Sequence, residues 1–363
     1  MSEREGPQRE RGATTPVRPE GRGGRRREER ELSEREGPQR ERGATTPVRS
    51  EGRGGRRREE RESTGQGVAL RPGRARAFLR LVVIEHSIFA LPFAYVAALT
   101  AMAPDVRWVD LLLVTVAMVA GRTFAMAANR VIDRKIDARN PRTARRELVT
   151  GAVSVRTAVV GALVALAVML TAAGLLNPLC LALAPAAIVP LAAYPYAKRV
   201  TNYPHAVLAL SQAAAPIGAW LAVTGSFSRP SVLPAVVLGL AVGSWIGGFD
   251  LIYACQDAEV DRTIGVRSVP ARWGVRVALR ASAITHLVTF GLLVWFGALA
   301  GYGWLWYVGL AVAALAFGYE HAIVRPNDLS RVNRAFFTAN GVVGLTLFAF
   351  ALADLVVHAG LHL

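Results

Sequence analysis

Long apolar runs, separated by short charged or Pro/Gly-rich breaks, fill the chain from residue 78 onward. Each run is long enough for a helix that crosses about 30 Å of hydrocarbon. The pattern therefore predicts an all-α integral membrane protein with nine transmembrane helices. These helices are expected at residues 78–103, 108–130, 154–175, 178–196, 204–224, 231–254, 278–299, 303–323 and 335–357. The break between the third and fourth helices rests on Leu176, Asn177 and Pro178 alone.

Basic residues predict how these helices are oriented. Of the 25 Lys and Arg residues after position 62, only Arg107 and Arg229 lie in the loops after the first, third, fifth and seventh helices. Lys and Arg in short loops are retained on the cytoplasmic side. We therefore expect a cytoplasmic N-terminus and an outward-facing C-terminus, and an even number of helices would break this alternation.

The first part of the chain has a different composition. Residues 2–31 recur at 33–62 with one change, Pro19 to Ser50, and these two copies are rich in Arg, Glu, Gly and Pro. Such a segment cannot bury enough apolar surface to fold, so residues 1–70 are predicted to be disordered and 71–363 to form the membrane domain. Clustered arginine suits RNA or anionic lipid. The interleaved glutamates weaken that reading, and no nucleic-acid partner is expected.

The two cysteines, Cys180 and Cys255, lack the paired spacing of a disulfide framework or a zinc site. This favours a protein that faces a reducing cytoplasm. No cleavable signal peptide is expected, because the N-terminus is charged and apolar segments begin only near Phe78.

Two acidic motifs lie at predicted helix ends. In "NRVIDRKID", Asn129, Asp133 and Asp137 are four residues apart and share one helical face. In "FDLIYACQDAEVD", the three aspartates, at positions 250, 257 and 261, are again expected on one face. Both motifs are predicted at the cytoplasmic membrane boundary. Facing carboxylates repel one another unless a cation neutralises them. Oxygen ligands without Cys suit Mg²⁺, which often binds carboxylates together with substrate phosphates.

Basic residues follow the predicted second helix, at whose end the first acidic motif lies, and also follow the predicted fourth helix. They are Arg142, Arg145 and Arg146 after the first motif, and Lys198 and Arg199, near Tyr194, after the fourth helix. The chain has only two lysines, and both lie in these charged segments. A compact ammonium there suits a diphosphate. The alternative is that each charge is only a solvated helix end. A cation transporter is a further alternative, but its carboxylates would recur at mid-membrane depth rather than at one boundary.

The motifs together resemble the UbiA superfamily of intramembrane prenyltransferases, over residues 78–357. "NRVIDRKID" is similar to the family's NxxxDxxxD motif, "DAEVD" to its DxxxD motif and "YPYAK" to its YxxxK motif. The resemblance implies nine helices around a central cavity, in the cytoplasmic membrane, with the active site facing the cytoplasm. It also implies Mg²⁺-dependent transfer of an isoprenoid from its diphosphate to a small aromatic acceptor.

The resemblance assigns roles to individual residues. The expected Mg²⁺ ligands are Asn129, Asp133, Asp257 and Asp261, with Asp137 in support. The diphosphate-binding residues that the resemblance implies are Arg142, Arg146, Tyr194 and Lys198, and Lys198 also serves catalysis by neutralising the leaving group. Arg199 is added as a diphosphate-binding candidate because it lies in the same charged segment as Lys198. Asp250 is a candidate base or acceptor-orienting group, or alternatively an outer partner of a metal ligand.

Three further residues are candidates for acceptor binding. Arg80 matches an arginine near the first helix of several family members. Glu85 lies in an apolar span, where an ionisable group is costly, although helix–helix hydrogen bonding would also explain it. Arg122 can anchor an acceptor carboxylate or pair with an aspartate.

Within the family, the motifs are most similar to the 4-hydroxybenzoate polyprenyltransferase branch of respiratory quinone biosynthesis. That branch includes relatives in menaquinone synthesis, so a naphthoate or futalosine-derived acceptor stays open. Glu85 and His86 stand where Asp-Lys-Pro is common in the branch, which leaves the acceptor undecided. Haem farnesylation and the synthesis of chlorophyll or glycerol-phosphate lipids are further alternatives.

Overall fold

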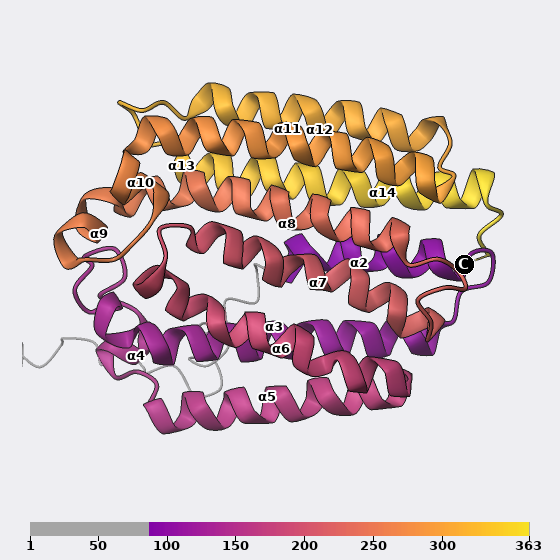
Figure 1. Cartoon of the computed structure of the whole chain (residues 1–363), viewed down its shortest axis with the longest axis horizontal. Helices are drawn as coiled ribbons and strands as arrows, with labels where there is room; N and C mark the ends of the chain where they lie inside the picture. The colour runs from indigo at the N-terminus through magenta and orange to yellow at the C-terminus, as the bar shows by residue number, and fades with distance from the viewer. Residues whose placement is uncertain (1–86, 363) are drawn as a thin grey trace, which may run out of the picture. The chain divides into compact units, whose positions relative to one another are not determined.

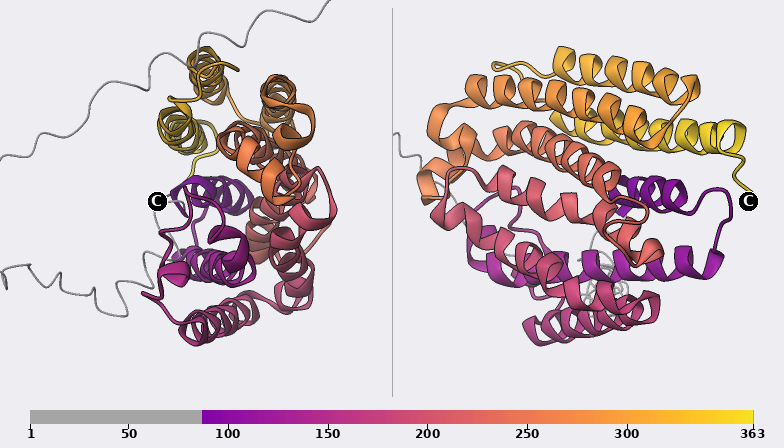
Figure 2. Two further views of the ribbon diagram at one scale, coloured as in Figure 1. Left: turned by 90° about the vertical axis from the view of Figure 1, so that its left-hand side faces the viewer. Right: turned by 45° about the vertical axis from the view of Figure 1, so that its right-hand side comes forward.

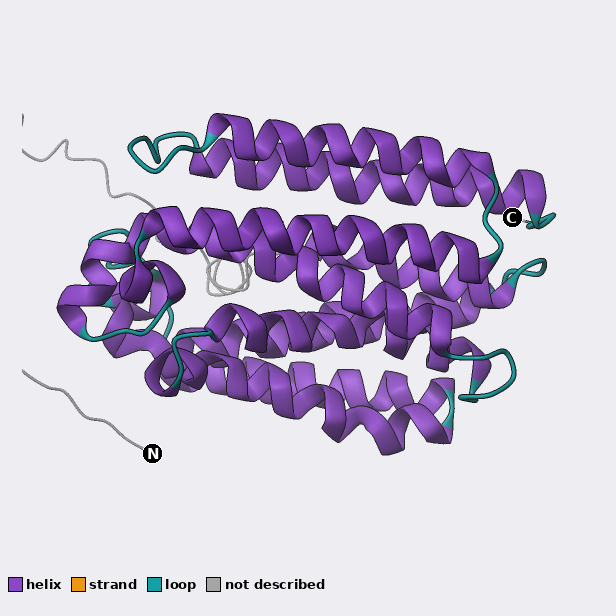
Figure 3. Ribbon diagram, turned by 45° about the horizontal axis from the view of Figure 1, so that its top comes forward, coloured by secondary structure: helices purple, strands orange, loops and turns teal. Residues whose placement is uncertain are grey.

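The computed structural model describes residues 87–362, and all long elements in this part are α-helices (Figures 1 and 3). Nine long helices of the described part lie where the sequence predicts spans. They are α2 (Ser87–Met102), α3 (Trp108–Asp137), α5 (Val155–Leu176), α6 (Pro178–Val200), α7 (Pro204–Thr224), α8 (Leu233–Ala254), α11 (Val275–Ala300), α12 (Trp304–Ile323) and α14 (Asn340–His358). The predicted tail, residues 1–70, lies outside the described residues.

Seven helical segments of residues 87–362 are long and apolar enough to cross a membrane. They comprise α3, α5, α6, α7 and α11, together with the longer segments Leu233–Ile264 and Val332–His358. The apolar part of α2 that is described, Leu91–Met102, is shorter. α12 is not among the seven, and it carries the polar residues Glu320 and His321 near its end. The all-helical fold is thus confirmed, whereas the count of nine spans stays a prediction.

The break between α5 and α6 is the single residue Asn177, as the sequence predicts. Its side-chain oxygen accepts a hydrogen bond from the backbone N–H of Cys180 at 2.9 Å. Pro178 begins α6, where a missing N–H leaves no helical hydrogen bond unmade. The two cysteines of the described part are free, in agreement with the sequence analysis.

Short helices connect the long ones. α4 (Glu147–Thr150), α9 (Ala258–Ile264) and α10 (Val269–Trp273) gather at the end where α3 and α8 finish (Figure 1). A 3₁₀ turn, η3 (Cys255–Asp257), joins α8 to α9, and α13 (Val332–Arg334) and the π-helical η4 (Ala335–Ala339) lead into α14. Loop residues that carry charge are therefore concentrated at one end of the helices.

The turn η3 corrects one prediction. Asp250, Asp257 and Asp261 were expected on one face of a continuous helix, but α8 ends at Ala254 and the chain tightens before α9. A 3₁₀ turn has three residues per turn, so the regular α-helical angle between Asp250 and the later aspartates is lost. The turn ends at Asp257, whose carboxylate is held by Asn140 and Arg142 from the loop after α3.

Helix α8 lies between α7 and α11, and α3 packs against α5 (Figure 2). The α7–α8 contact is close because α8 presents glycine once per turn, at Gly239, Gly243 and Gly247. A Cβ added at Gly243 would lie 2.5 Å from the carbonyl oxygen of Ala209 on α7. Small residues at such an interface let two helix backbones approach each other.

Replacing Gly243 with alanine is expected to destabilise the protein by about 1–3 kcal/mol, because the added methyl group forces the two backbones apart. Alanine has the higher helix propensity, so this loss runs against the local preference. The matched control is Gly318→Ala on α12, where a Cβ would meet nothing within 4 Å. Thermal unfolding of both variants in detergent measures the difference. Equal unfolding midpoints would contradict the close α7–α8 contact.

A buried polar network ties α8, α11, α12 and α14 together. Glu320 is 0% exposed and accepts a hydrogen bond from Asn340 Nδ2 at 3.3 Å. Asn340 Oδ1 in turn accepts from Trp245 Nε1 at 2.7 Å. His286 Nδ1 lies 3.6 Å from Glu320 Oε2. None of these four side chains lines the cavity described next, so the network fixes helix packing rather than the site.

Candidate active site

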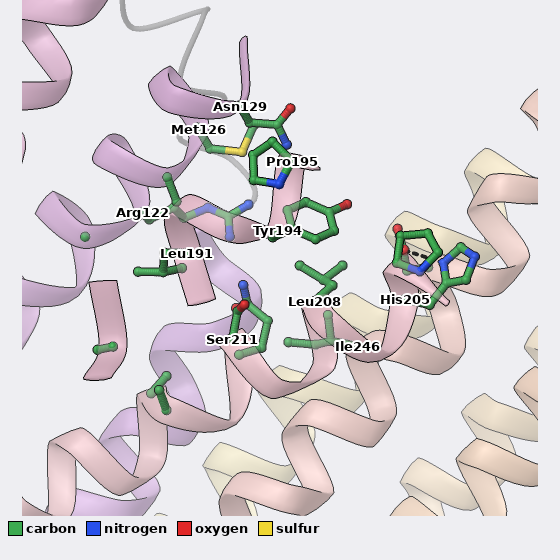
Figure 4. Close-up of a pocket in the computed structure, with 18 of the residues that line it drawn as sticks. Arg122, Met126, Asn129, Leu191, Tyr194, Pro195, His205, Leu208, Ser211 and Ile246 are labelled. Atoms are coloured by element: carbon green, nitrogen blue, oxygen red, sulfur yellow. Dashed lines mark hydrogen bonds and ion pairs between the residues drawn. The ribbon is translucent and has the colours of Figure 1, made fainter. Parts of the chain in front are cut away.

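A cavity of about 560 Å³ is lined mainly by α3, α6, α7 and α8 and by the loops at their charged ends (Figure 4). It brings most of the predicted site residues together. Those that line it are Arg122, Asn129, Asp133, Asp137, Arg142, Arg146, Tyr194, Lys198, Asp250, Asp257 and Asp261. Much of the remaining wall is apolar, with side chains such as Leu191, Leu208 and Ile246.

The first acidic motif is buried and paired with basic side chains. Asp133 is 1% exposed, and its Oδ2 forms an ion pair with Lys198 Nζ. Its other oxygen lies 3.2 Å from Arg199 Nη2. Asp137 Oδ1 lies 2.6 Å from Arg146 Nη1. The cations that the sequence assigned to diphosphate binding therefore neutralise the carboxylates of α3 in this structure.

The second motif has the same arrangement. Asp257 accepts hydrogen bonds from Arg142 Nε at 2.8 Å and from Asn140 Nδ2 at 3.0 Å. The Arg142 guanidinium also lies over the ring of Tyr253, 5.1 Å from its centroid. Burial alone would lower the pKa of Arg142, but the hydrogen bonds and charge of Asp257 outweigh burial and raise this pKa above its usual value. Arg142 is therefore a permanent cation at the cavity.

Asp261 is held less tightly than the other acidic side chains of the motifs. Ser268 Oγ donates to its Oδ2 at 3.4 Å, which is a long hydrogen bond. Ser268 belongs to the loop between α9 and α10, and this loop contacts the end of α6. The backbone N–H of Arg267 in this loop donates to the carbonyl of Lys198 at 2.9 Å. Its guanidinium donates to the carbonyl of Val200 at 2.8 Å. The loop thus joins the second acidic motif to the lysine that faces the first.

Some predicted residues lie elsewhere. Arg199 does not line the cavity, although its Nη2 lies 3.2 Å from Asp133 Oδ1. Arg80 and Glu85 lie outside the described residues. Arg122 lines the cavity from α3, and its buried Nε has no hydrogen-bond partner among the described residues. Figure 4 shows Arg122, Asn129 and Tyr194 on the same part of the wall.

The structure also brings in residues that the sequence analysis did not select, namely Asn140, Tyr253, His205 and Arg267. His205 Nδ1 lies 2.6 Å from Asp250 Oδ2. A histidine beside a proline at the start of an apolar span was the available signal for His205. The other three residues acquire their roles only through contacts between distant segments, which periodicity does not reveal.

The oxygen donors fit Mg²⁺ by their chemistry. No three Asp, Glu, His or Cys side chains among residues 87–362 gather as a closed metal site. Mg²⁺ does not require one, because it keeps several waters and usually takes one or two carboxylates plus substrate phosphates. Carboxylate and amide oxygens of Asn129, Asp133, Asp257 and Asp261 line the same cavity. These residues therefore suit a divalent ion that arrives with a phosphate-bearing ligand.

Comparison with protein families gives a direct match. The model of the UbiA prenyltransferase family matches residues 90–342, which includes both acidic motifs and all helices from α3 to α12. The chain belongs to the UbiA prenyltransferase family. It is a prenyltransferase and a multi-pass membrane protein, and the family resemblance inferred from the motifs is confirmed.

Two curated UbiA-family relatives illustrate the similarity. A 4-hydroxybenzoate solanesyltransferase of Synechocystis sp. is 35% identical over 225 residues, covering 61% of this chain and 74% of the relative. A 4-hydroxybenzoate octaprenyltransferase of Methylobacillus flagellatus is 32% identical over 288 residues, covering 77% of this chain and 94% of the relative.

Solved UbiA-family structures show the same fold. The apo structure of a UbiA homolog from Aeropyrum pernix superimposes with a TM-score of 0.69 at 36% identity, covering 75% of this chain and 98% of the homolog. A UbiA homolog from Archaeoglobus fulgidus bound to GPP and Mg²⁺ gives a TM-score of 0.58 at 19% identity, covering 77% of this chain and 100% of the homolog. At that identity the second match supports the fold alone.

Proposed function

We propose that this protein is an Mg²⁺-dependent polyprenyltransferase that moves a polyprenyl group from its diphosphate to 4-hydroxybenzoate, in respiratory quinone biosynthesis. One observation supports this most strongly. Two oxygen-rich motifs and a set of Arg and Lys side chains face the same cavity, whose remaining wall is largely apolar. The names of the relatives support the choice of acceptor.

The topology belongs to the same proposal. We expect nine transmembrane spans around a central cavity in the cytoplasmic membrane, with the N-terminus and the active site on the cytoplasmic side. Residues 71–363 would form the enzyme. The basic residues are distributed as this topology requires.

The diphosphate end of the donor is recognised by side chains that are already in place. Arg142, Arg146, Lys198 and Tyr194 line the cavity and can donate hydrogen bonds to phosphate oxygens. Asn129, Asp133, Asp257 and Asp261 would hold Mg²⁺, with Asp137 in support. When bound, Mg²⁺ neutralises negative charge on the diphosphate. When the donor binds, the same basic side chains would exchange their carboxylate partners for phosphate oxygens.

The apolar wall has a chemical role. Loss of diphosphate leaves an allylic cation, and water near this cation would capture it as an alcohol. Apolar side chains along α6 and α7 exclude water from the prenyl group. Lys198 and Arg142 stabilise the charge that develops on the departing diphosphate, so the C–O bond breaks while the cation remains protected.

The acceptor is expected deeper in the cavity. Arg122 precedes Asn129 by seven residues on α3, which is two turns, or roughly 10 Å along the helix. Its unpartnered Nε is suited to the carboxylate of 4-hydroxybenzoate. This arrangement would place the aromatic ring between Arg122 and the diphosphate end of the cavity.

Product mass spectrometry tests the proposal. The purified protein is incubated with Mg²⁺, with geranyl to octaprenyl diphosphate, and with either 4-hydroxybenzoate or naphthoate acceptors. We expect prenylated 4-hydroxybenzoate to form when Mg²⁺ is present. Its formation should stop when a chelator removes Mg²⁺ and should resume when Mg²⁺ is restored. A product with naphthoate only would overturn the choice of acceptor, and product formation that persists after chelation would overturn the role of Mg²⁺.

A further inference from the structure

His205 and Asp250 form a hydrogen-bonded pair at the wall of the cavity. His205 Nδ1 lies 2.6 Å from Asp250 Oδ2, and both residues line the cavity. We propose that His205 is a positioning residue, which holds Asp250 as the base that takes the ring proton when the aromatic acceptor is prenylated. This inference rests on the proposed function and adds a proton-transfer pair to it.

The packing of α7 on α8 fixes the pair. His205 follows Pro204 in the first turn of α7, and Asp250 lies in the last turns of α8. A Cβ at Gly247, one turn before Asp250, would lie 3.3 Å from the backbone oxygen of His205. The two backbones are therefore held close together where the pair forms. A catalytic carboxylate on rigid elements keeps its geometry better than one on a loop.

The burial of His205 favours one tautomer of its ring. The residue is 6% exposed, and its Nε2 is buried without a hydrogen-bond partner among the described residues. A charged imidazolium would leave an N–H at Nε2 unsatisfied, which is costly. The neutral ring with its proton on Nδ1 leaves only a lone pair at Nε2 and donates to Asp250. In this tautomer His205 donates to the Asp250 carboxylate and orients it.

Asp250 differs from the other cavity carboxylates in its partner. Asp133, Asp137 and Asp257 each form an ion pair with Lys or Arg. Ser268 holds Asp261, which lies in the second acidic motif. Asp250 alone among the acidic residues lining the described cavity has a histidine partner. Its charge is not shared with a permanent cation, so it remains available to accept a proton.

Figure 4 shows His205 set apart from Arg122, Asn129 and Tyr194. Tyr194, Asp133 and Asp250 also line this cavity. Asp250, His205 and Arg122 all line the same cavity, so Asp250 shares the space in which Arg122 would anchor the acceptor. This placement suits a base that faces the aromatic ring.

Prenyl transfer forms one bond to the aromatic ring and releases one proton from it. A ring carbon beside the hydroxyl forms a bond to the first carbon of the prenyl group, and the donor C–O bond breaks with its electron pair on the diphosphate. The same ring carbon then loses its proton to an oxygen of Asp250, and the C–H electron pair restores the aromatic ring. His205 keeps its Nδ1 proton throughout and holds the second oxygen of the carboxylate.

The test compares His205→Leu, which removes the donor, with His205→Asn, whose side-chain N–H lies near the position of Nδ1. The acceptor is 4-hydroxybenzoate with hydrogen or deuterium beside the hydroxyl. We expect His205→Leu to lower kcat on the order of 10- to 100-fold with an unchanged donor KM. A deuterium isotope effect on kcat should appear in this variant, because proton loss becomes rate-limiting. His205→Asn should restore both kcat and an isotope effect near unity.

The matched control is a second His–Asp pair. His358 Nδ1 lies 3.4 Å from Asp354 Oδ1 at the far end of α14, and neither residue lines the cavity. His358→Leu should leave kcat and the isotope effect unchanged. An active wild-type enzyme with no isotope effect in His205→Leu would overturn the inference alone, as would a loss that His205→Asn fails to restore. An inactive wild-type protein would overturn the proposed function and the inference together.

Discussion

Turnover is expected to fall by roughly 10³-fold when Asp261 is replaced by alanine, because the second acidic motif then loses an oxygen donor that no neighbour can replace. Asp261 is the clearest position for this test. Its partner in the structure is a long hydrogen bond from Ser268, so its removal leaves no buried cation without a counter-charge. Product formation from 4-hydroxybenzoate and a polyprenyl diphosphate measures the loss, and Mg²⁺-dependent thermal stabilisation in the presence of diphosphate measures binding separately.

Replacing Asp133 with alanine is expected to lower both turnover and stability. Asp133→Ala removes the shared partner of Lys198 and Arg199, so two cations are left beside each other. We expect a similar loss of turnover and, in addition, a lower unfolding temperature than in Asp261→Ala. The matched control is Asp110→Ala at the other end of α3, where the carboxylate pairs with Arg107. Normal turnover of Asp261→Ala in the presence of a chelator would refute the metal site, while a similar loss in Asp110→Ala would show that the effect is not specific.

The sequence predicted the helices and one side of the site well. Regular spacing on α3 placed Asn129, Asp133 and Asp137 on the cavity wall, because a straight helix preserves the 3.6-residue period. The same reasoning assumed a continuous helix after Ala254, where η3 interrupts it, although Asp250, Asp257 and Asp261 still line one cavity. Local spacing describes only a regular helix, and the contacts of Asp257 with Asn140 and Arg142 connect segments more than 100 residues apart in the chain.

The sequence also could not predict which acidic side chain pairs with which basic side chain in the site. The sequence predicted that acidic and basic residues gather at one end of the helices, but not that Asp133 faces Lys198 or that Asp137 faces Arg146. These pairings depend on how α3, α6 and the intervening loop pack. The His205–Asp250 pair depends likewise on the close α7–α8 contact that Gly243 and Gly247 permit.

The ion pairs have a consequence for donor binding. A buried carboxylate without a partner is costly, and the structure matches Asp133, Asp137 and Asp257 with permanent or near-permanent cations. A diphosphate that enters with a divalent ion offers a new partner to each side of these pairs. The free energy of donor binding is therefore the difference between two sets of charge contacts. On the proposed function, this exchange accounts for acidic and basic residues that occur together rather than in separate pockets.

Replacing Arg122 with methionine is expected to raise the KM for 4-hydroxybenzoate by about 100-fold, because a charge-assisted hydrogen bond to a carboxylate in a buried site is lost. The buried Nε of Arg122 has no partner among residues 87–362, so its N–H can donate to a bound carboxylate without breaking an existing hydrogen bond. Methionine retains most of the apolar stem, which limits the change in packing. Steady-state kinetics with each substrate varied in turn measures the two KM values.

A phenolic acceptor without the carboxylate separates anchoring from a general loss of structure. Wild-type enzyme should prefer 4-hydroxybenzoate over this analogue, and Arg122→Met should use the two acceptors about equally. The donor KM should stay unchanged, because Arg122 lies two helical turns from Asn129. Arg280→Met, on an exposed position of α11 outside the cavity, serves as the control and should keep the wild-type preference. If Arg122→Met still discriminates between the acceptors as the wild type does, the carboxylate is bound elsewhere in the cavity.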